Sequence, residues 1–208
     1  MTDRLAAVLH GIRLGGLSDV GAIADRSGLA ESEIAAVLVE VESAGWATLR
    51  SGRMSGWMLT REGRAEGERR LALELDATGR REELGRDYAR FLPLNRDFLA
   101  LCTDWQLRDI DGEAKLNDHA DVEYDTAIIG RLDALHRDIT SLIGRMASVV
   151  TRLAAYDSRF TEALQRVHEG RLEWFTKPII DSYHTVWFEL HEDLLATLGI
   201  ERSSEVAR

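Results

Sequence analysis

Six arginines lie between Ala47 and Arg70, and the same stretch holds only three glutamates. Guanidinium groups at this density suit contacts with phosphate oxygens, which dominate the affinity of proteins for nucleic acid. The candidates for such contacts are Arg50, Arg53, Arg61 and Arg64. The alternative is that the arginines pair with Glu62, Glu66 and Glu68 at helical spacing and form a solvated face.

The segment before these arginines is acidic. A helix expected over residues 31–44 carries Glu31, Glu33, Glu40 and Glu42 and no basic residue. Carboxylates that face phosphates are repelled and must be desolvated. Ser32, near the start of this helix, is the side chain there that we expect to contact DNA. The acidic helix therefore keeps open a second hypothesis, a protein-interaction module that does not bind DNA.

Polar and aromatic side chains are interleaved in the second half of the chain. The expected last helix places His184, Phe188 and His191 on one face, at spacing i, i+4 and i+7. With Trp105 and His119, they form a candidate effector pocket, in which histidine and arginine could hold a small anion or an aromatic acid. The alternative is that these are interface or surface histidines.

The sequence patterns that would indicate a metal site or a catalytic site are weaker in this region than those for an effector pocket. The residue types that could bind a metal are Asp118, His119, Asp121, His184, His191 and Glu192. Their spacing is not typical of a metal site, so we expect no metal and no cofactor. Cys102 lies beside Leu99 and Leu101, which is typical of a small buried residue rather than a nucleophile. No nucleophile elbow, P-loop or dinucleotide-binding glycine motif occurs, and we expect no enzyme.

The elements around the arginines are predicted from periodicity and capping residues. Apolar spacing predicts helices over 3–14 and 31–44, and Ser18 or Asp19 can cap a helix between them. Gly45 ends the third helix, and residues 46–50 and 57–60 have the pattern of a short hairpin. Thr60 is a good N-cap for a helix over 60–75.

This stretch resembles the winged helix-turn-helix of MarR- and PadR-like transcriptional regulators. Ala24, Gly28, Ile34 and Val37 fall at the family's spacing, and G-W-A-T-L and G-W-M-L-T-R-E-G match the strands of its wing. The resemblance covers residues 3–70, about a third of the chain. It implies a DNA-binding domain over residues 1–75, a regulator that acts as a dimer, and insertion of Arg53 at the wing tip into the minor groove.

A second resemblance involves S-G-R-M-S-G-W-M-L-T-R-E-G-R, F-L-P-L-N and W-F-T-K-P. These are similar to segments that accompany pyruvate, phosphate dikinase-like proteins, although no active-site motif of those proteins is present. The resemblance implies an accessory or regulatory module linked to phosphoenolpyruvate or pyruvate metabolism.

Residues 76–208 are expected to form a helical bundle for dimerisation and effector binding, so the fold class is mainly α. The predicted helices cover 80–107, kinked or split at Pro93, then 121–137, 138–154, 158–170 and 177–198, with Pro178 in the first turn of the last. Residues 109–119 are expected to be a polar loop. An apolar stripe from Ile128 to Val149 or Val150 suits a bundle core or a subunit interface.

Charge and composition limit the alternatives. The net charge is −10, of which only −2 belongs to residues 1–75, so any nucleic-acid contact must be confined to a local patch. The single cysteine cannot form an internal disulfide and suits a reducing compartment. No apolar run approaches the ~20 residues that span a bilayer, and the N-terminus is a poor signal peptide. We expect a cytoplasmic location.

Overall fold

The computed structural model describes residues 3–110 and 112–201. It is mostly helical, with 73% of the residues in helices and 8% in strands, which confirms the mainly α class. The chain divides into two compact units. Of the described residues, 3–81 and 191–201 form one (the N-terminal unit), and Glu82–Leu190 forms the other (the bundle unit). The boundary expected at residue 76 lies within a helix that ends at Thr78, and residues 191–201 belong with the N-terminal unit.

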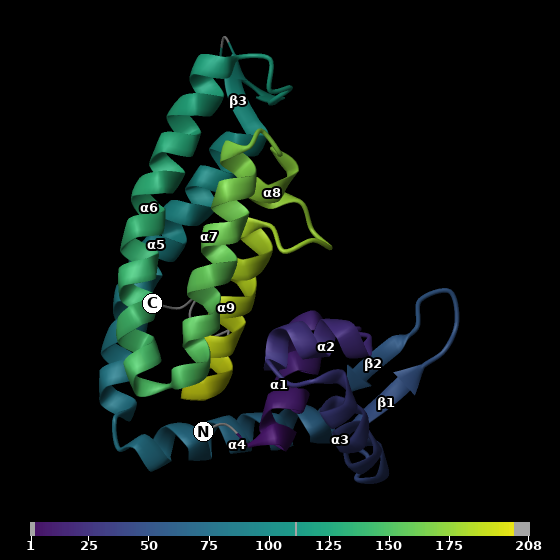
Figure 1. Ribbon diagram of the computed structural model, residues 1–208. Coiled ribbons are helices and arrows are strands. Elements are labelled where there is room, and N and C mark those ends of the chain that lie inside the picture. The colour runs from purple at the N-terminus through teal and green to yellow at the C-terminus, as the bar shows by residue number, and fades with distance from the viewer. Residues whose placement is uncertain (1–2, 111, 202–208) are drawn as a thin grey trace. The chain divides into compact units, whose positions relative to one another are not determined.

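The N-terminal unit contains four complete helices and a hairpin. In chain order they are α1 (Arg4–Gly15), α2 (Val20–Ser27), α3 (Glu31–Ser43), β1 (Ala47–Arg50), β2 (Gly56–Leu59) and α4 (Arg61–Thr78). Strands β1 and β2 pair antiparallel, with Ala47 opposite Leu59 and Arg50 opposite Gly56. An isolated bridge joins Ser18, between α1 and α2, to Trp57 of β2. The hairpin projects beyond the helices α1, α2 and α3 (Figure 1).

The core of this unit follows from the helical periodicity of its first three helices. Leu9 and Ile12 of α1, Ile23 of α2 and Ile34 of α3 are completely buried and belong to one cluster. Apolar residues three or four positions apart share a helix face, so each helix buries one stripe against the others.

The junction between the hairpin and α4 is held by Thr60. Its hydroxyl accepts a hydrogen bond from Gly63 N at 3.0 Å and lies 2.8 Å from the carbonyl oxygen of Gly45, to which it donates. This confirms Thr60 as the N-cap of α4. Gly63 is required here, because a Cβ at this position would overlap the backbone carbonyl of Trp46.

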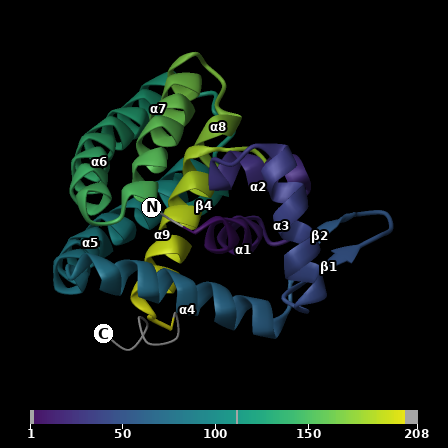
Figure 2. The same ribbon diagram turned by 60° about the horizontal axis from the view of Figure 1, so that its bottom comes forward.

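The bundle unit consists of α5 (Arg81–Gln106), β3 (Leu107–Ile110), β4 (Glu113–Leu116), α6 (Val122–Val149), a 3-10 turn η1 (Thr151–Ala154), α7 (Ala155–His168), α8 (Glu173–Thr176) and the first half of α9 (Tyr183–Leu198). Helices α5, α6, α7 and α9 lie side by side (Figures 1 and 2). Arg81 itself is counted with the N-terminal unit.

An aromatic cluster fills the centre of the bundle unit. The rings of Phe98 on α5 and Trp187 on α9 stack with centroids 4.3 Å apart, and Phe160 on α7 lies 4.8 Å from Tyr183. Trp187 Nε1 donates to Asn95 Oδ1 at 2.9 Å, so the buried indole keeps a hydrogen-bond partner. Burial raises the pKa of the Tyr183 hydroxyl.

Two predicted boundaries in the bundle unit are wrong. The helices expected over 121–137 and 138–154 are one helix, α6, because the apolar stripe keeps its period across residue 138 and nothing there breaks a helix. Ile128, Leu132, Ile139 and Met146 of that stripe are buried within the chain, so the stripe is bundle core. The polar loop expected over 109–119 overlaps an antiparallel pair of strands, β3 and β4, of which β3 already begins at Leu107.

The two prolines can be compared with the prediction. Helix α5 is not split at Pro93 but continues through it, and Pro93 is exposed on the helix surface. Pro178 is not in the first turn of the last helix, since α9 begins at Tyr183. The hydroxyl of Ser182 accepts from Thr185 N at 3.3 Å and caps that start.

Candidate functional site

The four candidate arginines lie on the hairpin and the first turn of α4. Arg50 ends β1, Arg53 lies in the loop between the strands, and Arg61 and Arg64 begin α4; all four are exposed. Arg50 Nη1 lies 3.7 Å from Met58 Sδ, across the hairpin. The Thr60 cap fixes where α4 starts and therefore holds Arg61 and Arg64 next to the hairpin.

The arginines of this region divide into paired and unpaired groups. Arg69 and Arg70 both donate to Glu66, at 2.7 and 2.6 Å, and Arg70 also pairs with Asp3. In the part of the chain that the structure describes, Arg53, Arg61 and Arg64 have no carboxylate within ion-pair distance. The alternative that the arginines pair with glutamates and form a solvated face therefore holds for the middle of α4. It does not hold for the start of α4 or for the hairpin.

Glu66 illustrates how strongly the paired group is held. The hydrogen bond from Arg69, with further contributions from Arg70, lowers the pKa of the Glu66 carboxyl from an ordinary value of 4.5 to about 2. The Glu66 side chain is 15% exposed, and its two partners keep it charged. Glu68, the next acid along, pairs with Arg13 of α1 at 2.6 Å. Glu66 and Glu68 therefore pair with arginines of the next turn of α4 and of α1, and they do not pair with the arginines at the start of α4.

Helix α3 presents an acidic face with small side chains in its middle. Glu31, Glu40 and Glu42 are exposed and pair with none of the described residues, whereas Glu33 pairs with Arg4 at 3.2 Å. The exposed residues between them include Ser32, Ala35, Ala36 and Val39, the last 66% exposed. This face repels phosphate and offers little hydrogen-bonding capacity to base edges.

The structure brings only two of the five candidate effector residues together. Trp105 and His119 lie with ring centroids 4.4 Å apart. His184 stacks on Phe98 at 6.1 Å instead, and burial lowers its pKa. Phe188 is 44% exposed, and His191 is buried and belongs to the N-terminal unit. The three α9 residues therefore do not share one site with His119.

His119 belongs to a hydrogen-bonded network at the start of α6. Its Nδ1 lies 2.9 Å from Asp125 Oδ2, and Asn117 Nδ2 donates to Asp125 Oδ1 at 2.9 Å and to Trp105 O at 3.1 Å. The backbone of His119 is in the left-handed region, with φ of 59°, which costs a non-glycine residue energy. The network thus fixes the position of the imidazole.

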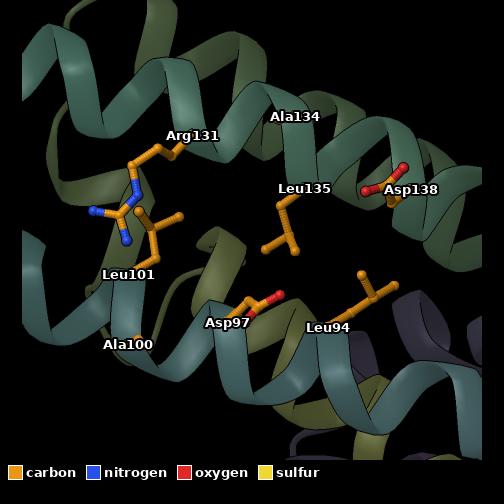
Figure 3. A pocket seen from close by; sticks show the side chains of 8 residues that line it. All are labelled: Leu94, Asp97, Ala100, Leu101, Arg131, Ala134, Leu135 and Asp138. Atoms are coloured by element: carbon orange, nitrogen blue, oxygen red, sulfur yellow. The ribbon is translucent and has the colours of Figure 1, made fainter.

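Two further carboxylates line a groove between α5 and α6, with Leu94 and Leu135 between them (Figure 3). Asp97 of α5 and Asp138 of α6 line it with Leu94, Leu101 and Leu135, and its volume is about 300 Å³. Arg131, at one end, already pairs with Asp104 at 2.6 Å. Two acids without a buried polar partner do not by themselves define a site.

The described residues contain no cluster of three or more histidine, cysteine, aspartate or glutamate side chains that could hold a metal ion. Cys102 is buried on α5, and burial raises the pKa of its thiol to about 12. A thiol with so high a pKa is a poor nucleophile, because the thiolate is the reactive form.

Several residues of interest were not predicted from the sequence. Asp125 carries the His119 network, and Asp133 and His168 form a second pair at 2.8 Å. Asp125 and Asp133 are eight positions apart on one helix, a signal that the sequence offered. His119 lies on the loop just before α6, whereas His168 lies on α7, so only the second pair depends on the packing of α6 against α7.

None of the helices within residues 3–110 and 112–201 is long and apolar enough to cross a lipid bilayer. Comparison with known proteins adds no assignment to this geometry, since no protein-family model, curated protein or solved structure matches the chain.

Proposed function

We propose that the chain is a DNA-binding transcriptional regulator whose N-terminal unit is a winged helix-turn-helix. The support is the order of its elements: α1, the bridge at Ser18, α2, α3, the β1–β2 hairpin and α4. In such a unit the hairpin is the wing, and α3 occupies the place of the recognition helix. The division of the arginines into paired and unpaired groups carries the proposal.

The wing and the start of α4 hold the phosphates. Arg53, Arg61 and Arg64 are exposed and unpaired among the described residues, so binding a phosphate costs them no internal ion pair. Arg69 and Arg70 would have to leave Glu66 first. The acidic face of α3 lies away from the backbone of the DNA, and sequence is read mainly by the wing through the minor groove.

The regulator acts as a dimer, because two reading heads at fixed spacing raise both affinity and specificity for a two-fold symmetric site. Light scattering of the purified chain measures its molar mass directly. A mass of about twice 23.3 kDa is expected at micromolar concentration.

Binding to DNA is tested by fluorescence anisotropy with a duplex taken from upstream of the chain's own coding sequence and a scrambled duplex of equal length. The double variant Arg61→Glu/Arg64→Glu should weaken binding at least about tenfold, because two guanidinium groups that hold phosphates are replaced by carboxylates that repel them. The plot of log affinity against log salt should become shallower by about one for each phosphate that is no longer neutralised.

Arg96→Glu/Arg137→Glu is the matched control. Arg96 of α5 and Arg137 of α6 are exposed arginines without an ion-pair partner among the described residues, so this double variant reverses the same two charges without breaking an ion pair. It should bind as the wild type does. An equal loss of affinity in both variants would show that the effect comes from net charge and not from these positions. If the wild type shows no saturable binding at low salt, the proposal is wrong.

A second candidate function is supported by the face of α3. Val39 is exposed between Glu40 and the small residues Ala35 and Ala36, a surface that suits a basic, partly apolar protein partner better than DNA. The variant Glu40→Gln/Glu42→Gln separates the two candidates. If the chain binds DNA through its wing, the variant leaves DNA binding unchanged. If α3 instead forms the surface for a basic protein partner, the wild type shows no saturable DNA binding and the variant weakens capture of that partner.

A further inference from the structure

A groove in the bundle unit lies between the first half of α6 and the end of α7, with a volume of about 550 Å³. Two histidine–aspartate pairs stand on its walls, His119 with Asp125 and His168 with Asp133. The wall between them is apolar and includes Ile129 and Val167. We call it the two-histidine groove.

Each histidine is bonded to its aspartate through one ring nitrogen. The distances are 2.9 Å from His119 Nδ1 to Asp125 Oδ2 and 2.8 Å from His168 Nε2 to Asp133 Oδ1. Within the described parts of the chain, His119 Nε2 and His168 Nδ1 have no hydrogen-bond partner. In a neutral ring whose N–H points to the carboxylate, the other nitrogen accepts a hydrogen bond.

The two pairs are spaced along one helix. Asp125 and Asp133 are eight residues apart on α6, which at 1.5 Å per residue separates their backbones by about 12 Å. A single metal ion needs all of its ligands within about 2.0–2.2 Å, so this separation favours an extended ligand with a polar group at each end.

The charge of the lining selects the sign of the ligand. Among the described residues that line the groove, the two aspartates and the two histidines are the only ionisable side chains, with no lysine or arginine. The net charge of the lining therefore lies between −2 with both rings neutral and zero with both protonated. It is never positive, so the groove does not attract a phosphate or a carboxylate.

Gly130 leaves the groove open at its centre. It lies on α6 between the two pairs, and a Cβ built there meets no atom within 4 Å. The first atom of a side chain at this position would thus not collide with the protein, and a larger side chain would occupy space at the groove.

We infer that the two-histidine groove binds an extended organic cation of the diamine or polyamine class. Its methylene chain lies along Ile129 and Val167, and its terminal amino groups donate to the free nitrogens of His119 and His168 beside the two carboxylates. If the chain is a DNA-binding regulator, this ligand is its effector, but the site does not depend on that function.

Isothermal titration calorimetry of the full chain with 1,8-diaminooctane tests the inference, with octanedioate as a probe of equal length and opposite charge. One diamine should bind per chain, and octanedioate should not bind. The variant Gly130→Leu should weaken diamine binding at least about tenfold by occupying the groove, while leucine's higher helix propensity preserves α6.

Gly144→Leu is the matched control, since Gly144 is an exposed glycine of the same helix with equally open space and lies outside the groove. It should bind the diamine as the wild type does. No saturable heat with the wild type, equal binding by Gly130→Leu, or tighter binding of octanedioate would each overturn the inference. Because no DNA is present, the result is independent of the test of DNA binding.

Discussion

The N-terminal unit and the bundle unit use the same residue types in opposite surroundings. His10 and Asp193 of the N-terminal unit pair at 2.9 Å with side chains only 6% and 3% exposed. In the groove of the bundle unit, His168 and Asp133 pair at 2.8 Å with side chains 50% and 34% exposed. The buried pair links α1 to the end of α9, whereas the groove pairs face open space.

The helical glycines show the same difference. Gly63 of α4 lies against the backbone of Trp46 with no room for a methyl group, and Gly130 of α6 borders the groove with no atom near it. The compared histidine, aspartate and glycine are therefore packed against other protein atoms in the N-terminal unit, whereas their counterparts in the bundle unit border a groove that is open to solvent. Packing density, rather than residue type, distinguishes the two roles.

The largest effect is expected from Gly63→Ala. The new Cβ would overlap the Trp46 carbonyl, so the start of α4 must move away from the hairpin, at a cost of about 3 kcal/mol or more in the free energy of unfolding. Urea unfolding followed by circular dichroism measures this loss. Gly67→Ala is the control, since its Cβ would lie at an ordinary 3.6 Å from Leu9 Cβ. That variant should be neutral or gain up to about 1 kcal/mol.

Asp193→Ala tests the buried pair. It leaves His10 buried without its carboxylate and removes the acceptor 3.0 Å from the Thr197 hydroxyl, so we expect a loss of about 3 kcal/mol. Asp133→Ala breaks the exposed pair and should cost about 0.5 kcal/mol or less. Similar losses in the two variants, measured by the same urea titration, would contradict the distinction between closed and open pairs.

A smaller, pH-dependent effect is expected at Glu66, whose partners are only partly shielded from water. Because its pKa is lowered to about 2 in the folded protein, its charge stabilises the fold above pH 4.5, and this contribution is lost as the pH falls toward 2. Glu66→Gln should cost about 1 kcal/mol at pH 7, a modest value because Arg69 is exposed. The difference from wild type should shrink between pH 4.5 and 3, and a difference that stays constant with pH would exclude the ion pairs as its source.

Much of the local structure could be predicted because its causes act over a few residues. Thr60 caps α4, Gly79 ends it in the left-handed conformation, and Asp19 caps α2, all through contacts within four positions. The β3–β4 hairpin was not predicted, although Asp111 and Gly112 form a dipeptide that favours tight turns. The start of α9 differs from the prediction because Ser182, and not Pro178, defines the first turn.

The candidate sites were only partly predictable, because the three-dimensional surroundings decide which of several possible partners a side chain reaches. The basic stretch over residues 47–70 could be recognised in the sequence. The sequence did not show that Arg70 pairs with Glu66 and Asp3, whereas Arg64 pairs with neither. His119 was visible as a candidate, but its partner Asp125 was not, and the three α9 residues grouped with it lie elsewhere.

By itself the sequence determined the helical class, the N-caps of α2 and α4, the hairpin with its exposed arginines and the apolar stripe of α6. Periodicity and capping depend on neighbours within one or two turns, and those neighbours are adjacent in the chain. Only the tertiary structure decided which histidine is buried, which arginine is unpaired and which glycine faces a groove. Those properties depend on contacts such as Arg13 with Glu68, 55 positions apart, and no local pattern contains them.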